Sequence, residues 1–180
     1  MSASPFVAGW IHELAAGNDR QRSFSKRALD LAMGRGRHAL VLAQNGFSTF
    51  GVDVKLDAVR DAVRAAALEG LTVHGWCADL TMFPLPPGAF DLVVVTRYLQ
   101  RDLFPSIRAA VRPGGCVIYE TFTVHQRALG VGPTSADHLL EPGELRELFR
   151  GWEVLFYEEV TAPEAVARIV ARRPADATPI

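Results

Sequence analysis

Two aspartates in the first third of the chain lie at positions where they could bind a charged ligand. Asp30 lies four residues before Gly34 in the stretch 28–36, where an apolar run with an acid near its end is followed by two glycines and a helical run. This order predicts a strand that turns tightly into a helix. Glycines in such a turn let backbone N–H groups approach a nucleotide-like ligand, because no Cβ blocks the approach.

The charge of Asp30 narrows the choice of ligand. The spacing Gly34, Gly36 and Ala39 also fits the fingerprint of dinucleotide-binding proteins, and a strand, turn and helix without any ligand is a third interpretation. A carboxylate at the end of the strand would repel a pyrophosphate. It would suit a ligand that carries an ammonium and a sulfonium, as S-adenosylmethionine does, so this ligand is favoured.

Two further acids follow the next two predicted strands. Asp53 ends the strand 48–53, 19 residues after Gly34, where a carboxylate could accept hydrogen bonds from the two hydroxyls of a ribose. Asp79 follows the strand 71–77, where it could accept from an adenine amino group while Leu80 packs near the ring. Either aspartate could instead be a capping or turn residue.

These residues need a sheet that brings the carboxyl ends of its strands together. Runs of apolar and β-branched residues predict seven strands, at 28–32, 48–53, 71–77, 90–96, 116–121, 152–160 and 165–171. Helical patterns at 37–44, 56–70 and 102–111 and a loop at 82–88 connect the first five. Only four residues separate the last two, which must pair antiparallel if they are neighbours. The fold class is therefore α/β, a Rossmann-like doubly wound seven-stranded sheet, mostly parallel with a C-terminal antiparallel strand pair.

Candidate catalytic residues follow the later strands. Thr96, Arg97 and Tyr98 lie at the carboxyl end of the strand 90–96, and Glu120 lies at the end of the strand 116–121. Tyr98, Glu120 and His125 are the candidates for a general base, if the reaction needs one. Each has another interpretation: Tyr98 as a pocket wall, Glu120 as a salt-bridged residue and His125 as a loop residue. Histidine and acid spacing around His125 does not favour a metal site.

The rest of the chain fits one domain over residues 1–180. A helix at 6–16 could pack at the edge of the domain or form a flap, and residues 20–26 form a polar linker. The long segment 123–141 contains Gly130, Gly132 and Pro133 and resembles a loop over a site. A turn is expected at 113–115, a helix at 142–150 and a loose tail at 174–180.

Composition excludes several classes of partner. The net charge is −1, so no basic face for nucleic acid is indicated, and no apolar run approaches the length of a membrane span. No signal peptide is seen at the N-terminus. Cys77 and Cys116 are expected to be buried, reduced thiols, which makes the cytoplasm the expected location. The oligomeric state is not indicated.

The sequence resembles the class I S-adenosylmethionine-dependent methyltransferases from about Phe6 to Arg172. The motifs that carry the resemblance lie at 29–36, 51–53, 78–80, 90–93 and 112–115. Within that class, the stretches 97–101, 119–122 and 139–145 resemble the bacterial tellurite-resistance-type branch.

The resemblance implies a role for each residue that binds the cofactor S-adenosyl-L-methionine. Its methionine end would lie against Asp30, Ala32, Gly34 and Gly36; its ribose and adenine against Asp53, Val54, Asp79 and Leu80; and its methyl group near Thr96 and Arg97. The chain departs from the pattern at Ala32, where the class usually has glycine, and at Met33, where the branch often has cysteine. Met33 is expected to narrow the pocket.

The function predicted from all of these residues is methyl transfer to a small-molecule acceptor, which could be a thiol, an amine, a carboxylate or a metalloid oxyanion. Arg97 and Arg101 near the mouth of the site favour an anionic acceptor. One alternative is a non-catalytic S-adenosylmethionine-binding partner protein. Another is a nicotinamide-dependent oxidoreductase, against which Asp30 and the final antiparallel strands argue.

Overall fold

The structure is a computed structural model that describes residues 2–17 and 26–175. Nearly all of the predicted linker 20–26 and most of the predicted tail 174–180 lie outside the described residues. Among the described residues, no helix is both long and apolar enough to cross a membrane.

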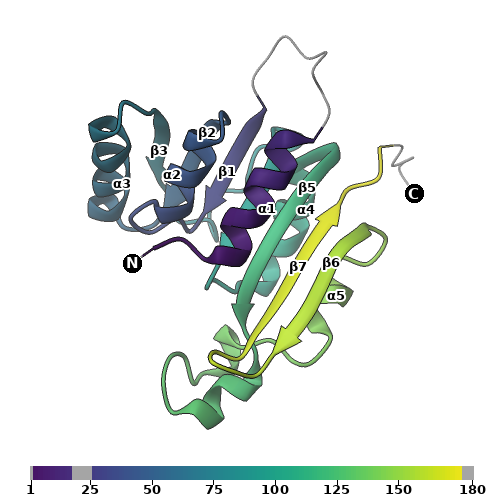
Figure 1. Cartoon of the computed structure of the whole chain (residues 1–180). Coiled ribbons are helices and arrows are strands. Elements are labelled where there is room, and N and C mark those ends of the chain that lie inside the picture. The colour runs from purple at the N-terminus through teal and green to yellow at the C-terminus, as the bar shows by residue number, and fades with distance from the viewer. Residues whose placement is uncertain (1, 18–25, 176–180) are drawn as a thin grey trace.

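Seven strands form one mixed sheet in the order β3-β2-β1-β4-β5-β7-β6 (Figure 1). Their bounds are β1 Arg27–Leu31, β2 Ser48–Asp53, β3 Val73–Cys77, β4 Phe90–Thr96, β5 Val111–Phe122, β6 Glu153–Val160 and β7 Val166–Arg172. The first five strands are parallel, and β7 runs antiparallel to both β5 and β6. The predicted fold class is confirmed, including the C-terminal antiparallel pair.

The strand order reverses at β1, which lies between β2 and β4. In open α/β sheets a ligand binds beyond the carboxyl ends of the strands at such a reversal. Helices α2 (Arg37–Gln44) and α3 (Leu56–Leu68) follow β1 and β2, and the loops that lead into them begin at these ends. The fold thus places the predicted glycine turn and Asp53 at one edge of the sheet.

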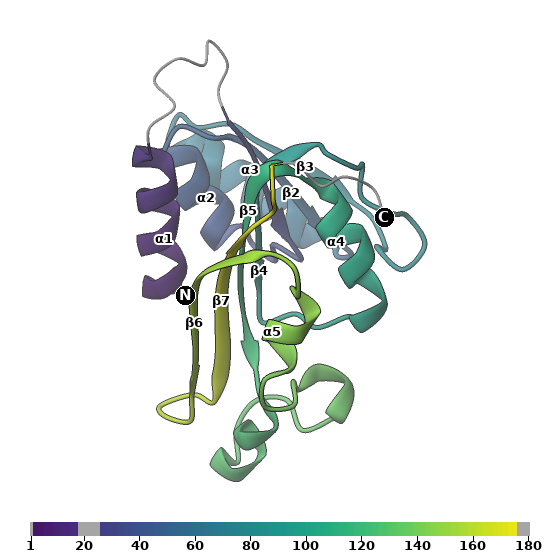
Figure 2. The same cartoon turned by 90° about the vertical axis from the view of Figure 1, so that its right-hand side faces the viewer.

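Helices cover both faces of the sheet (Figures 1 and 2). Helix α1 (Pro5–Ala16) and α2 pack on the face that carries Leu92 and Val94, and α3 packs beside α2. Helices α4 (Phe104–Ala110) and α5 (Glu144–Leu148) pack on the opposite face, against Val93 and Val95. Successive side chains of a strand point to opposite faces, so these four buried β4 residues contribute to two separate cores.

Several predicted elements differ in detail from the structure. The predicted helix 102–111 is a 3-10 turn, η1 (Arg101–Leu103), followed by α4, and the helix 142–150 is shorter, as α5. The predicted turn at 113–115 lies within β5, where Gly114 has φ 76° and the register with β4 shifts. The chain therefore makes the predicted turn within the strand, as an irregularity after which the pairing with β4 resumes at Cys116.

The prediction that both cysteines are buried is wrong for Cys77. Cys116 is buried in β5, but Cys77 is exposed at the end of β3, which is an edge strand of the sheet. An edge strand is covered on fewer sides, so an apolar run does not bury all of its side chains there. Both cysteines are free thiols.

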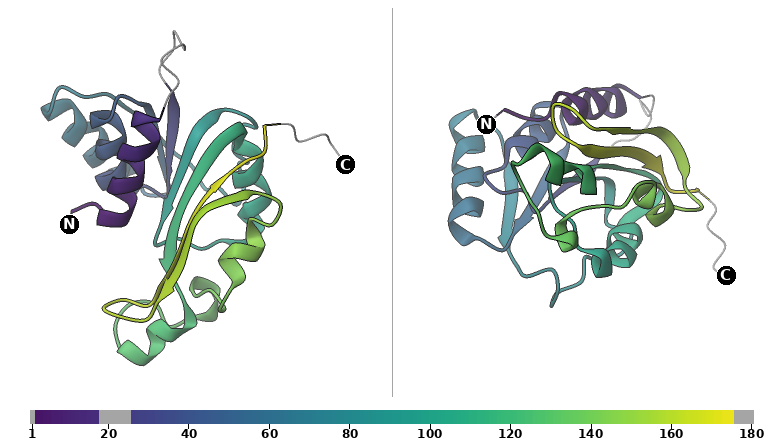
Figure 3. Two further views of the ribbon diagram at one scale, coloured as in Figure 1. Left: turned by 45° about the vertical axis from the view of Figure 1, so that its right-hand side comes forward. Right: turned by 90° about the horizontal axis from the view of Figure 1, so that it is seen from below.

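Segment 123–141 is more ordered than a plain loop. It contains two 3-10 helices, η2 (Val124–Leu129) and η3 (Ala136–His138), and a bridge joins Thr123 to Leu140. It lies beyond the carboxyl end of β5, beside the turn between β6 and β7 (Figure 3).

Candidate functional site

Three residues with left-handed backbone angles build the turn after β1. The φ angles of Ala32, Gly34 and Gly36 are 53°, 54° and 78°. A Cβ on Gly34 would meet no atom within 4 Å, whereas a Cβ on Gly36 would lie 2.5 Å from the Cβ of Ala62. Gly34 therefore leaves space for a ligand, and Gly36 lets α2 pack against α3. Ala32 holds its angle at a cost of about 1–2 kcal/mol, which explains why glycine suits this position.

Asp30 lies buried beneath this turn, with 1 % of its surface exposed. Its Oδ2 accepts a hydrogen bond of 2.8 Å from the backbone N–H of Ala39 in α2, while its Oδ1 is buried without a hydrogen-bond partner among the described residues. Burial raises the pKa of Asp30 to about 7, although the hydrogen bond from Ala39 opposes the rise. The carboxyl group thus ties β1 to α2 and keeps one unsatisfied oxygen.

The expectation that Met33 narrows the ligand cavity is wrong. Its side chain is buried against α3 and β3, with Val59 and Val73 among its cluster. A Cβ on Gly51 would lie 2.0 Å from its sulfur, so the thioether occupies the space that this glycine leaves in β2. Met33 packs into the core, and the cavity has other walls.

Asp53 at the end of β2 fixes the same turn from the other side. Its Oδ2 accepts a hydrogen bond of 2.8 Å from the N–H of Gly34, and its Oδ1 accepts one of 2.9 Å from the N–H of Lys55. Each carboxylate oxygen can accept a second hydrogen bond. Asp53 is therefore a structural residue of the turn that can still accept from ligand hydroxyls.

Asp79 forms a turn with Thr81 at the entrance to the same cavity. Its Oδ1 accepts from the backbone N–H of Thr81 at 2.9 Å and from the hydroxyl at 2.7 Å. These hydrogen bonds lower the pKa of this exposed carboxyl group. Leu80 lies beside it and is half-buried. Asp79 can therefore be a turn residue and still bind a ligand.

A cavity of about 400 Å³ opens at the carboxyl ends of β1 and β2. Seven predicted cofactor-binding residues line it: Ala32, Gly34, Asp53, Val54, Asp79, Leu80 and Arg97. The other three, Asp30, Gly36 and Thr96, do not line it.

The residues of this cavity fit the expected cofactor. An unsatisfied buried carboxylate oxygen lies beneath the turn, at Asp30, and two further carboxylates line the wall. The space that a side chain at position 34 would fill is open, because this residue is glycine. Acids suit the ammonium and the ribose hydroxyls of S-adenosylmethionine, and the apolar surfaces of Val54 and Leu80 suit its adenine.

The structure separates the three predicted catalytic residues. Tyr98 lines the 400 Å³ cavity, and burial raises the pKa of its phenol, which is neutral at pH 7. Glu120 is buried and its Oε2 lies 2.6 Å from the Nε of Arg168, so it belongs to an ion pair. His125 is exposed in η2 and lines neither this cavity nor the one described next. Their roles as bases stay predictions.

A second, charged cavity of about 300 Å³ adjoins the first, and Arg97 lines both. Its walls come from α1 and the residues before it, from α2, and from the ends of β4, β5 and β7. The lining residues are Ser2, Ala3, Ser4, Pro5, Arg37, Arg97, Glu120, Glu164 and Arg168.

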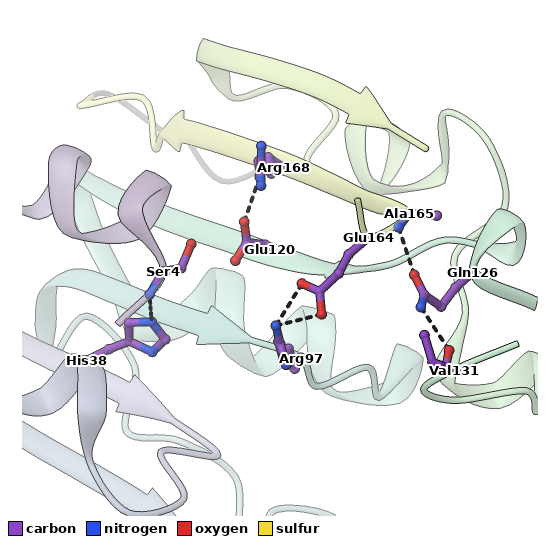
Figure 4. Close-up of polar contacts among 9 residues, drawn as sticks. All are labelled: Ser4, His38, Arg97, Glu120, Gln126, Val131, Glu164, Ala165 and Arg168. Carbon is purple, nitrogen blue, oxygen red and sulfur yellow. Dashed lines mark hydrogen bonds and ion pairs between the residues drawn. The ribbon is translucent and has the colours of Figure 1, made fainter. Parts of the chain in front are cut away.

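His38 holds the N-terminal wall of this charged cavity (Figure 4). Its Nε2 accepts a hydrogen bond of 3.1 Å from the backbone N–H of Ser4, so the proton is assigned to Nδ1, which lies 3.2 Å from Thr96 Oγ1. Burial, with the nearby charges of Arg37 and Arg97, lowers the pKa of His38 to about 4. The imidazole is neutral at pH 7, and the contact with Ser4 requires it to be so.

Arg101, expected at the mouth of the site, has a structural role. Its Nε and Nη2 contact the carboxylate of Glu144 at 2.6 and 2.9 Å, and Nη2 also donates to the carbonyl of Leu139 at 3.0 Å. It joins η1 to α5 and to the end of segment 123–141. Of the two arginines expected there, only Arg97 lines a cavity described here.

Four site residues are absent from the sequence predictions: Arg37, His38, Glu164 and Arg168. The first two begin a helix and carried no signal beyond their place after Gly36. Glu164 and Arg168 come from the turn between β6 and β7 and from β7 itself. An antiparallel partner for β5 could have suggested Arg168, which pairs with Glu120 in the register.

Comparison with known proteins agrees with the fold. Residues 28–115 match the family described as a methyltransferase domain. The ubiquinone biosynthesis O-methyltransferase of Idiomarina loihiensis is 24 % identical over 123 residues, 65 % of this chain and 51 % of that protein. The chain spans about half the length of this curated relative.

Solved structures of other proteins share the fold. TehB from Haemophilus influenzae has a TM-score of 0.72 at 17 % identity, covering 92 % of this chain and 62 % of that one. An S-adenosylmethionine-dependent methyltransferase from Methanosarcina mazei has a TM-score of 0.71 at 16 % identity, covering 98 % and 100 %. At these identities the likeness shows the fold.

Proposed function

We propose that this chain is a class I S-adenosylmethionine-dependent methyltransferase and that it transfers a methyl group from S-adenosylmethionine to a small-molecule acceptor. The observation that carries the proposal is the 400 Å³ cavity, where Asp53, Asp79 and the open face of Gly34 meet at the carboxyl ends of adjacent strands. The two free cysteines suit a reducing compartment, so we place the protein in the cytoplasm.

Different residues of the cavity bind different parts of the cofactor. Asp53 accepts from the ribose hydroxyls through the lone pairs that Gly34 and Lys55 leave, and Asp79 accepts from the adenine amino group while Leu80 packs near the ring. Gly34 lets the ligand approach the backbone, and Asp30 holds the turn to α2.

The cofactor supplies an electrophilic methyl carbon: a lone pair of the acceptor forms the new bond, and the electrons of the carbon–sulfur bond go to the sulfur, whose positive charge is lost. The chain must hold the acceptor in line with that carbon and exclude water, which can supply much of the rate acceleration. Tyr98 and Arg97 line the cavity on the side of the charged cavity and would orient the acceptor.

A small acceptor is supported by size and charge. The net charge of −1 offers no broad basic face for nucleic acid. The charged cavity beside the cofactor cavity measures only about 300 Å³.

Incubation with S-adenosylmethionine labelled in its methyl group tests the proposal. The acceptors to try are small thiols, amines, carboxylates and oxyanions, with tRNA and protein as controls. Label on a small molecule supports the proposal. Label on tRNA or protein alone contradicts the small acceptor, and binding of the donor without any turnover indicates a non-catalytic binding protein.

A further inference from the structure

We propose that the charged cavity is the acceptor pocket and that it takes a small molecule bearing a carboxylate, which binds Arg97 in place of Glu164. This inference rests on the proposed function, because it names the class of acceptor for the same site. It starts from a carboxylate that already occupies Arg97. Nη2 of Arg97 donates to Oε1 and Oε2 of Glu164 at 2.9 and 2.7 Å (Figure 4).

Among residues 2–17 and 26–175, Arg97 alone lines both cavities. An anion held on it therefore lies at the boundary between the cofactor and the charged pocket. Its backbone has φ 53°, which is rare for a side chain of this size, and its N–H donates to the carbonyl of Glu120 at 2.8 Å. The guanidinium also lies 5.4 Å from the centre of the Phe122 ring. The neighbouring strand thus maintains a strained conformation that aims Arg97 into the cavities.

Positively charged side chains outnumber negatively charged ones among the residues that line the cavity. Three arginines and two glutamates line it. Burial lowers the pKa of Arg37, and the charge of Arg97 lowers it further, so these two guanidinium groups lie close enough to repel each other. The same two charges disfavour a proton on His38. An added anion would relieve this repulsion.

The two ion pairs in the cavity differ in how easily they can exchange. The Arg168 and Glu120 side chains are only 27 % and 8 % exposed, and Arg168 also contacts Glu158 at 2.7 Å. The Arg97 and Glu164 side chains are 38 % and 44 % exposed. Exposed ion pairs contribute little to stability, whereas breaking a buried pair leaves an uncompensated charge. An acceptor carboxylate would therefore displace Glu164 and leave Glu120 in place.

Hydrogen bonds hold the backbone beside Glu164, so only the Glu164 side chain needs to move when an acceptor binds. The N–H of Ala165 donates to Oε1 of Gln126 at 2.7 Å, and its carbonyl accepts from the N–H of Thr123 at 2.9 Å. Gln126 in turn donates to the carbonyl of Val131 at 2.8 Å. Rotation of the Glu164 side chain out of the cavity would vacate the carboxylate position without a change in the turn.

Titration with benzoate in the absence of the methyl donor tests this proposal. Isothermal calorimetry on the whole chain should give binding that Glu164→Gln tightens by about two- to fivefold, because the internal competitor is lost. Arg97→Gln should weaken it by about tenfold or more, and Arg97→Lys should recover part of the loss. If Glu164 competes with benzoate for Arg97, the two substitutions change benzoate affinity in opposite directions. If the ion pair is purely structural, both substitutions change the affinity in the same direction.

The matched controls are Arg150→Gln and Glu147→Gln, which break an exposed ion pair within and beside α5. Neither should change benzoate binding, and neutral methyl benzoate should not compete. The proposal is overturned if Glu164→Gln weakens benzoate binding, if Arg97→Gln leaves it unchanged, or if Glu164→Gln gives no saturable binding up to about ten millimolar. Tighter binding of inorganic phosphate than of benzoate would also overturn it.

The affinity of wild type and Glu164→Gln for S-adenosylmethionine is measured in parallel. If both bind the donor but benzoate binding does not follow the prediction, the carboxylate pocket is wrong and the proposed function stands. If neither binds the donor, the proposed function itself fails.

Discussion

The stability of Asp30→Asn relative to wild type should increase as pH rises. Asn has nearly the same shape as Asp, keeps a carbonyl oxygen for the N–H of Ala39, and does not ionise. In the variant an amide nitrogen replaces the unpaired Oδ1. The free-energy cost of burying this nitrogen on folding does not depend on pH. Only the change with pH therefore reports on the buried carboxyl group.

The sign follows from proton binding. In the folded chain Asp30 keeps its proton up to a pKa of about 7, whereas the unfolded chain releases it near 3.8. The folded state thus binds more protons between these values, so wild-type stability falls as pH rises. The contribution is complete below 3.8 and is lost above about 7. At 1.36 kcal/mol per pKa unit the whole loss is about 4 kcal/mol, of which about 2.5–3 kcal/mol falls between pH 5 and pH 8.

Urea unfolding of both proteins between pH 5 and pH 8.5 measures this difference. The free energy of unfolding of Asp30→Asn minus that of wild type should rise by about 2.5–3 kcal/mol from pH 5 and level off near pH 8. Asp61→Asn, at an exposed site on α3, is the matched control. A flat difference for Asp30→Asn would refute the reasoning that burial governs this carboxyl group.

Three further substitutions test the site. Asp53→Ala should weaken S-adenosylmethionine binding about 10–100-fold by calorimetry, because charge-assisted hydrogen bonds are lost; unchanged affinity would make Asp53 a turn residue only. Ala32→Gly should raise the free energy of unfolding by about 1 kcal/mol, since it removes the cost of φ 53°, and a loss of stability would contradict this. Arg101→Gln, or deletion within 130–138, should lower methyl transfer while leaving donor affinity nearly intact, if segment 123–141 covers the site as the sequence predicts; equal loss of both would contradict that prediction.

The first cavity was predictable because its signals are local. The positions of acids and glycines at strand ends follow from the strand pattern once the strands are parallel, because the carboxyl ends of parallel strands meet at one edge of the sheet. Gly34 and Asp53 also bond to each other across that edge. The depth of Asp30 differs from expectation, because a residue within the strand is covered by the helix that follows.

The charged cavity could not be predicted in the same way. Its partners are joined by antiparallel register and turn geometry: Glu120 faces Arg168 across 48 positions, and Glu164 reaches Arg97 from a turn. A strand pattern does not specify the register between β5 and β7. Met33 shows the same limit, because a glycine in the neighbouring strand, Gly51, decides where its side chain packs.

The central claim is that the 400 Å³ cavity binds a methyl donor, and calorimetric titration of the wild-type chain tests it most directly. The account predicts saturable binding of S-adenosylmethionine and of its demethylated product at about micromolar levels, and no response to NAD. Micromolar binding of NAD with no response to S-adenosylmethionine would contradict it.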